Sequence, residues 1–146
     1  MDYTELIKKI NRSQALLDSV YEELAEEYSM TFNALMVIYI MTEEKDVTQK
    51  VICDELYLPK STVHSIVNDF MKKELIGFSD KKIGKEKVLC LTLEGDVLSK
   101  KIMQRVKRTE KEILVFLGDD YCKKLDVISD RLMEYFERRY ADEKHA

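Results

Sequence analysis

Hydrophobic residues recur at helical spacing along most of this chain. From Tyr3 to about Tyr28 they return every three or four residues, which predicts one long amphipathic helix. The next segment, from Phe32 to about Met41, is apolar on nearly every side. Such a helix is buried all round, so we expect it to lie between two other parts of the fold, with Thr31 as its cap.

The stretch from Val47 to Leu91 predicts two short helices with a tight turn between them. Thr48 is a good cap for the first helix. Pro59 fixes its own φ and disfavours a helical conformation in Leu58, so it marks the turn and suits the opening of the second helix. The second helix then buries one apolar stripe, formed by Val63, Ile66, Val67, Phe70 and Met71.

A hairpin is predicted to follow these helices. Its first strand runs from Ile76 to Ser79, and its second from Val88 to Leu91. Gly84 lies in the lysine-rich turn, where a hairpin tip often requires a positive φ. Two helices and a hairpin in this order have the layout of a winged helix-turn-helix, a mainly α fold with a small β-hairpin wing.

The exposed positions of this stretch fit contacts with double-stranded DNA. Short hydrogen-bonding groups and cations suit base edges flanked by phosphates, and a basic hairpin beside them suits the phosphate backbone or minor groove. A solvated helix surface and a solvated charge run are the alternatives. The candidate contacts are Thr48, Lys60, Ser61, Thr62, His64, Ser65 and Asn68 in the helices, and Lys81, Lys82, Lys85 and Lys87 in the hairpin.

Two more helices are predicted after the hairpin. Thr92 is a good cap for the first, which extends about 25 residues to Gly118, a natural helix stop. The last begins at Asp119 or Asp120. The terminal helices carry more apolar surface than one small lobe can cover, so we expect a homodimer. A two-fold dimer would place two recognition helices about 34 Å apart and predicts a palindromic site.

Composition and charge agree with a DNA-binding domain on an acidic scaffold. The chain has 146 residues, 45% hydrophobic and 36% charged, and no apolar run of membrane-spanning length, so we expect one domain in the cytoplasm. Its net charge is −4. Residues 48–90 hold eight lysines and six acidic residues, a net +2, which leaves −6 elsewhere.

These motifs resemble the MarR family of winged-helix transcriptional regulators. The resemblance rests on Thr48-Gln49, on Pro59-Lys60-Ser61-Thr62-Val63, on Lys72-Lys73-Glu74-Leu75-Ile76 and on Leu91-Thr92-Leu93-Glu94-Gly95. It implies an obligate homodimer, usually a repressor, that binds a pseudo-palindromic operator and releases it on meeting a small molecule or oxidant. It also implies one MarR-like domain over residues 1–146, with the winged helix-turn-helix in 32–92 and dimerisation helices in 1–28 and 93–140.

The chain departs from the family pattern at three places. Lys85 lies near the position of an arginine that commonly enters the minor groove, and the wing is one residue short. His64-Ser65 replaces an arginine often found in the recognition helix, and Phe78 lies where a basic residue is frequent. From these differences we expect weaker binding or an unusual sequence preference.

The resemblance also implies an effector pocket above the winged helix-turn-helix of residues 32–92, which we call the reading lobe. Aromatic and methionine side chains there suit a small aromatic or amphipathic ligand, although ordinary core packing is the alternative. The candidate lining consists of Tyr21, Tyr28, Phe32, Met36 and Tyr39.

No motif predicts catalysis, a cofactor or a metal site. The chain has two histidines and three separated cysteines, Cys53, Cys90 and Cys122, so it lacks zinc-ligand spacing. Small buried hydrophobes are the simplest interpretation of the cysteines, and a redox response through Cys53 or Cys90 is the alternative. Two other functions stay open: a winged-helix dimer that acts as a protein-interaction module or antirepressor, and a small-molecule binding protein without a DNA role.

Overall fold

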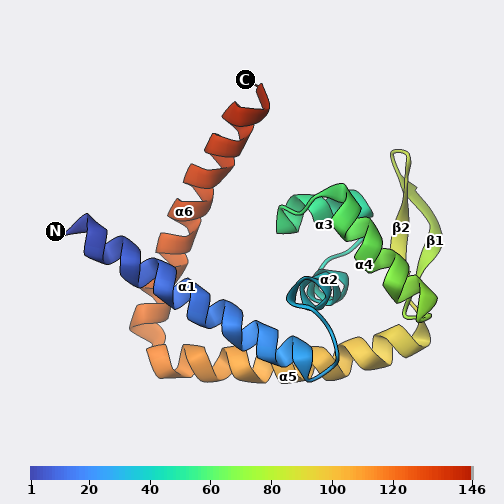
Figure 1. Ribbon diagram of the computed structural model, residues 1–146, viewed down its shortest axis with the longest axis horizontal. Coiled ribbons are helices and arrows are strands. Elements are labelled where there is room, and N and C mark those ends of the chain that lie inside the picture. The colour runs from blue at the N-terminus through green and yellow to red at the C-terminus, as the bar shows by residue number, and fades with distance from the viewer. Residues whose placement is uncertain (146) are drawn as a thin grey trace. The chain divides into compact units, whose positions relative to one another are not determined.

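The computed structural model describes residues 1–145 and confirms the predicted class, mainly α with a small β-hairpin (Figure 1). Within these residues the elements follow the order of a winged helix-turn-helix flanked by longer helices. Their bounds are α1 Tyr3–Glu26, α2 Phe32–Glu43, α3 Gln49–Leu56, α4 Lys60–Lys72, β1 Ile76–Ile83, β2 Glu86–Leu91, α5 Leu93–Leu117 and α6 Asp119–His145.

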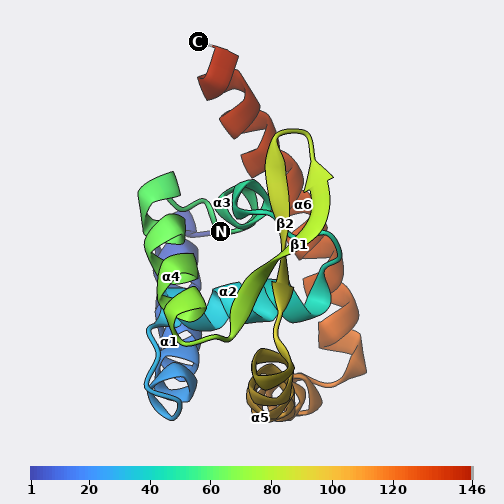
Figure 2. The ribbon, with the colours of Figure 1, turned by 90° about the vertical axis from the view of Figure 1, so that its right-hand side faces the viewer.

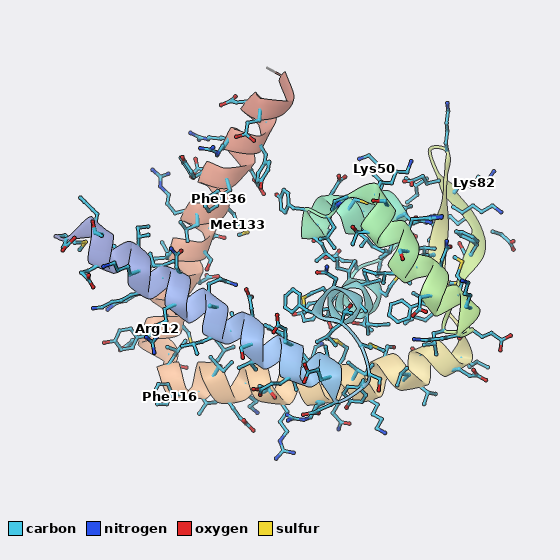
Figure 3. The ribbon with its side chains drawn as sticks, viewed as in Figure 1. Arg12, Lys50, Lys82, Phe116, Met133 and Phe136 are labelled. Atoms are coloured by element: carbon cyan, nitrogen blue, oxygen red, sulfur yellow. The ribbon has the colours of Figure 1, made fainter. Side chains whose placement is uncertain are left out.

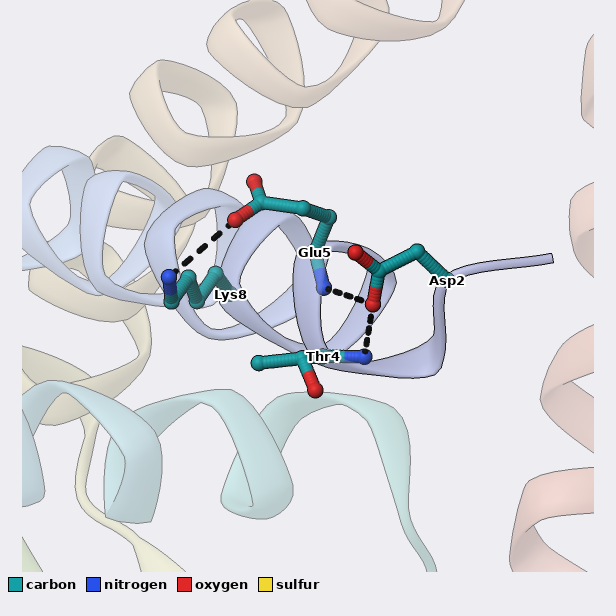
Figure 4. Close-up of polar contacts among 4 residues, drawn as sticks. All are labelled: Asp2, Thr4, Glu5 and Lys8. Atoms are coloured by element: carbon teal, nitrogen blue, oxygen red, sulfur yellow. Dashed lines mark hydrogen bonds and ion pairs between the residues drawn. The ribbon is translucent and has the colours of Figure 1, made fainter.

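Polar side chains begin the helices where the sequence predicted caps. The Thr31 hydroxyl accepts a hydrogen bond from the Ala34 amide at 3.1 Å, and the Thr48 hydroxyl accepts one from Val51 at 3.2 Å. A further cap lies at Asp2, whose carboxylate accepts from the Thr4 and Glu5 amides at 2.9 and 3.4 Å (Figure 4). Each cap satisfies amides that the helix itself leaves without partners.

The chain divides into two compact units, Met1–Val106 and Lys107–Ala146. The first contains α1 to α4, the hairpin and most of α5. The second contains the last part of α5, the turn at Gly118 and α6. Gly118 has a φ of +80°, the conformation in which glycine commonly ends a helix.

Helix α2 lies at the centre of the first unit, as its all-round apolar sequence predicted (Figure 1). Val37, Ile38, Ile40 and Met41 pack into one core with residues of α3, α4 and the hairpin, and we call this cluster the reading-lobe core. Leu35 packs into a second cluster, the stem core, with residues of α1 and α5. Each fully buried aliphatic side chain stabilises the fold by about 1.5–3 kcal/mol.

The hairpin is longer than the sequence predicted. Ile83 pairs with Glu86, so the strands extend to the two-residue turn of Gly84 and Lys85. Gly84 has a φ of +60° at the first turn position, which a type II′ turn requires. The pairing register shifts between Phe78 and Lys82, and this bulge accommodates polar residues after Ser79, where the sequence predicts the end of the first strand.

Hydrogen bonds from Thr92 close the reading lobe between the end of α4 and the start of α5. The Thr92 hydroxyl donates to the carbonyl of Glu74 at 2.6 Å and accepts from the Gly95 amide at 3.0 Å. Its own amide donates to Leu75 at 3.1 Å. This arrangement brings α5 so close to Leu75 that position 95 has no room for a side chain.

Both terminal segments expose large apolar side chains. In α1 only Leu24 and Ala25 are buried, and the first half of the helix leaves Leu6, Ile7 and Ile10 exposed. In the second unit, Phe116 is 90% exposed, and it is labelled with Met133 and Phe136 in Figure 3. The last helix exposes an apolar stripe as well, and we call it the α6 face: Leu125, Ile128, Leu132, Tyr135 and Phe136.

We expect Gly95→Ala to destabilise the protein by about 2 kcal/mol or more. A Cβ at position 95 would lie 1.9 Å from the carbonyl oxygen of Leu75, and only movement of the backbone could relieve that overlap. Gly77→Ala is the matched control, because no heavy atom lies within 4 Å of its added Cβ. Urea denaturation followed by circular dichroism measures both variants, and equal midpoints would contradict the packing described above.

Candidate nucleic-acid interface

Helix α4 is fixed by one buried face and presents the opposite face to solvent. Val63, Val67 and Phe70 are buried in the reading-lobe core. The residues between the members of this stripe point away from the core. Lys60, Ser61, His64 and Ser65 are exposed, while Thr62 and Asn68 are half-buried. The candidate recognition residues therefore lie together on one side of one helix.

The turn between α3 and α4 sets the direction of that face. Tyr57 ends α3 in the left-handed conformation, with a φ of +52°, and the amide of Leu58 donates to the carbonyl of Cys53 at 3.3 Å. Pro59 then lies just before α4, and its carbonyl accepts from the amides of Thr62 and Val63 at 3.1 and 3.2 Å. The proline thus begins the second helix, as the sequence predicted.

A line of polar contacts crosses from α3 to α4. The Nδ1 atom of His64 lies 3.3 Å from Oε1 of Gln49, and its Nε2 atom lies 3.0 Å from Nδ2 of Asn68. We call these three residues the polar relay. Gln49 belongs to the Thr48-Gln49 motif but is not among the predicted contacts, because nothing in the sequence indicates that α3 brings it against His64.

The hairpin is attached to the start of α3 and lies alongside that helix (Figure 2). The amide of Leu89 donates to the carbonyl of Val47 at 2.7 Å. The Lys81 ammonium donates to the carboxylate of Asp46 at 2.8 Å, so this lysine, predicted as a phosphate contact, is already paired. These two bonds fix the base of the wing relative to the recognition helices.

Three other wing lysines are exposed near the tip. Lys82, labelled in Figure 3, pairs across the strands with Lys87, and Lys85 occupies the turn. The Lys87 ammonium lies 5.4 Å from the ring centroid of Phe78, which holds the cation over an aromatic face. These positive charges lie close together on a projecting hairpin, a position suited to phosphate contacts.

Thr48 lies with the core and not with the exposed face. It is 2% exposed, and its hydroxyl is engaged as the cap of α3. We therefore leave Thr48 out of the contacts proposed below, although the sequence placed it among them.

A polar hollow adjoins the exposed face of α4 at the start of α2. It has a volume of about 450 Å³ and is open to solvent on one side. Five of its six lining residues carry a hydroxyl or amide group, and the sixth is aliphatic: Thr31, Asn33, Ser61, Thr62, Ser65 and Ile66. The sequence does not indicate Thr31 and Asn33 as candidate contacts, because their nearness to α4 depends on how α2 packs.

A second hollow of about 550 Å³ separates α3 and the start of α4 from the wing tip. Cys53 lines it beside Lys60 and Lys85. Burial, the main cause, and then the charges of Asp54 and Glu86 raise the pKa of the Cys53 thiol. Since the thiolate is the reactive form, the raised pKa favours the unreactive thiol and disfavours the redox alternative for this residue.

Lys50, labelled in Figure 3, lies on the rim of this hollow and is held by a neighbouring carboxylate. Its ammonium donates to Asp54 at 2.8 Å, and this hydrogen bond raises the pKa of Lys50. The lysine keeps its positive charge at neutral pH, but part of that charge is balanced by Asp54.

The candidate effector residues surround the stem core. Tyr21, Tyr28, Met36 and Tyr39 are half-buried and pack against it. Phe32 is also half-buried, and its ring meets that of Tyr21 edge to face with centroids 6.3 Å apart. The structure thus brings these side chains into one region where α1 and α2 meet.

Across residues 1–145 no group of three or more histidine, cysteine, aspartate or glutamate side chains is arranged to hold a metal ion. No helix in the same part of the chain is long and apolar enough to cross a membrane.

Comparisons with known proteins point to one family. Residues 28–81 match the model of the MarR family. No curated protein matches the chain.

Solved structures share the fold over nearly the whole chain. A MarR family regulator from Neisseria meningitidis is 20% identical, with a TM-score of 0.77 over 94% of this chain and 97% of that chain. Staphylococcus aureus MarR in complex with salicylate and kanamycin is 13% identical, with a TM-score of 0.78 over 93% of each chain. In the MepR-DNA complex of S. aureus, the protein is 16% identical, with a TM-score of 0.72 over 92% of this chain and 96% of that chain. The resemblance suggested by the sequence motifs is confirmed.

Proposed function

Because residues 28–81 match the MarR family and the whole chain has the fold of that family's structures, we propose that the protein is a sequence-specific DNA-binding transcriptional regulator. One observation carries the proposal: an exposed row of hydroxyl, amide and imidazole groups on α4 lies beside a lysine-tipped wing. The S. aureus MepR-DNA complex, which has the same fold, supports a duplex as the ligand.

The two elements would read DNA in different ways. In this proposal the major groove receives the exposed side of α4: Lys60, Ser61, Thr62, His64, Ser65 and Asn68. Lys82, Lys85 and Lys87 contact phosphates or the minor groove, and Lys81 serves mainly to hold the wing through Asp46. Base-edge contacts specify sequence, whereas phosphate contacts supply affinity that falls as salt rises.

The polar hollow at the start of α2 would accept a backbone phosphate. Thr31 and Asn33 lie on the α2 side of this hollow, and hydroxyl and amide groups are common donors to phosphate oxygens. A phosphate held there would fix the height of α4 in the groove.

We propose that the protein acts as a homodimer. The α6 face and the first half of α1 are exposed apolar surfaces, and covering such side chains on both copies would provide the driving force. A two-fold dimer presents two recognition helices about one DNA turn apart, which matches a pseudo-palindromic operator.

Release by a small molecule completes the proposed repressor mechanism. The half-buried aromatic and methionine side chains around the stem core suit a small aromatic or amphipathic effector. The complex of S. aureus MarR with salicylate and kanamycin supports this class of ligand. Since α2 belongs to both cores, an effector that moved α2 would change the spacing of the two recognition helices in the dimer.

The alternative function is a winged-helix dimer that binds proteins and no operator. The pairing of Lys81 with Asp46, the absence of arginine from residues 48–90 and the net charge of −4 favour it. Because family members are regulators and not enzymes, we propose no catalytic step in either case.

Selection from a random duplex library tests the main proposal. We expect a palindrome with half-sites about ten base pairs apart, bound at least about a thousandfold more tightly than a scrambled duplex. Fluorescence anisotropy at two salt concentrations measures both affinities. Weak binding that ignores sequence would contradict the regulator and favour the protein-interaction alternative.

We expect Lys85→Ala and Ser65→Ala to have different effects on binding. Loss of the Lys85 charge should weaken binding to every duplex and reduce the salt slope by about one, because one phosphate contact is lost. Ser65→Ala should change the ranking of sites and leave the slope unchanged. Lys9→Ala, which removes an exposed lysine of α1, is the charge-matched control. A uniform loss on all sequences from Ser65→Ala would contradict its place at the bases.

We expect Ile128→Asp to weaken the dimer by at least tenfold, because it places a charge in the centre of the α6 face. Val127→Asp is the matched control, since Val127 is also exposed but lies about 100° round the helix. Sedimentation equilibrium measures both dissociation constants. A monomeric wild type, or equal weakening by the two variants, would rule out this face as the interface.

A further inference from the structure

We propose that Gln49 and His64 are positioning residues that hold the amide of Asn68 in one orientation, and that Asn68 thereby reads an adenine in the major groove. The inference rests on the proposed function, because it requires that α4 lies against base edges. It adds a specific base and two residues that act through a third.

The amide orientations of Gln49 and Asn68 in the structure require one tautomer of His64. Oε1 of Gln49 can only accept, so Nδ1 of His64 donates to it across 3.3 Å. A neutral imidazole carries one ring proton, so Nε2 is then an acceptor. Nδ2 of Asn68, 3.0 Å away, donates to it. One neutral tautomer of His64 therefore satisfies both contacts in a continuous series from α4 to α3.

With Nε2 of His64 as the acceptor, only one of the two orientations of the Asn68 amide makes this hydrogen bond. With the amide turned over, its carbonyl oxygen would face the lone pair of Nε2, and two acceptors would oppose each other. In the observed orientation one N–H of Asn68 is engaged with His64, while Oδ1 and the other N–H remain available. Asn68 thus offers one acceptor and one donor to a ligand.

An adenine edge matches that pair of groups. In the major groove adenine presents N7 as an acceptor and the N6 amino group as a donor, and asparagine binds both at once. Guanine presents two acceptors at the same edge, N7 and O6, which the carbonyl of Asn68 would repel. An asparagine free to turn over would discriminate less well between these bases.

The relay lies at the surface, so folding does not depend on it. His64 is exposed, Gln49 and Asn68 are half-buried, and the buried face of α4 is formed by other residues. Neutral hydrogen bonds at such positions contribute little net stability. Substitution of His64 should therefore alter base preference while leaving the urea midpoint almost unchanged.

The test uses the full-length protein and the duplex selected above. The base pair at which Asn68→Ala abolishes the base preference is located first. Binding is then compared for the selected duplex and for the three duplexes that carry another base pair at that position. We expect His64→Ala to reduce the preference for adenine at that position by about tenfold, with unchanged salt dependence. His64→Gln should restore it, because its carboxamide oxygen can accept from Asn68. In the Asn68→Ala background, His64→Ala should have no further effect on base preference.

A second measurement examines the relay without DNA. The nitrogen chemical shifts of the imidazole of His64 at neutral pH report its tautomer, and His145→Ala assigns the only other histidine. We expect the proton on Nδ1, and a proton on Nε2 would overturn the relay. Full adenine preference in His64→Ala, or equal weakening for all four bases, would overturn it too. If the wild type itself prefers no sequence, the proposed function fails. If the wild type is selective and His64→Ala keeps the same base preference, only the relay fails.

Discussion

Burial of α2 on both sides is the constraint on which the rest of the first unit depends. Leu35 packs toward α1 and α5, while Val37 and Ile38 pack toward α3, α4 and the hairpin. A helix with this composition cannot face water on either side without losing several buried side chains, each worth about 1.5–3 kcal/mol. The reading lobe and the long helices are therefore joined by a shared hydrophobic element, and the exposed face of α4 has a fixed direction relative to α1.

Periodicity and capping chemistry predicted the helices well, because both act over a few neighbouring residues. The threonine caps and the glycine stop at Gly118 lie where their sequence context indicated. The strands were predicted less completely. Their extent depends on which residues pair across the hairpin, and the shifted register between Phe78 and Lys82 cannot be deduced from either strand alone.

The candidate site was predictable in its residue types and less so in its contacts. Opposition to a buried stripe was enough to place Ser61, His64 and Ser65 on the outer side of α4. Sequence could not show that Lys81 meets Asp46, 35 positions earlier, nor that Gln49 meets His64, because both contacts arise from the packing of separate elements. Thr48 illustrates a different difficulty: one hydroxyl serves either a helix start or a ligand, and only its burial decides between them.

The irregular pairing of the wing also disfavours edge-to-edge aggregation through its outer strand. β2 is paired with β1, and its Leu89 amide is bonded to Val47, but β1 has no partner on its outer edge within the described sheet. An open edge of regular strand is a template on which another chain can add a strand. The bulge after Phe78 interrupts the repeat of free amides and carbonyls along that edge, and Lys81 and Lys82 place charges in the same segment. A projecting hairpin can thus remain exposed in solution without inviting edge-to-edge aggregation.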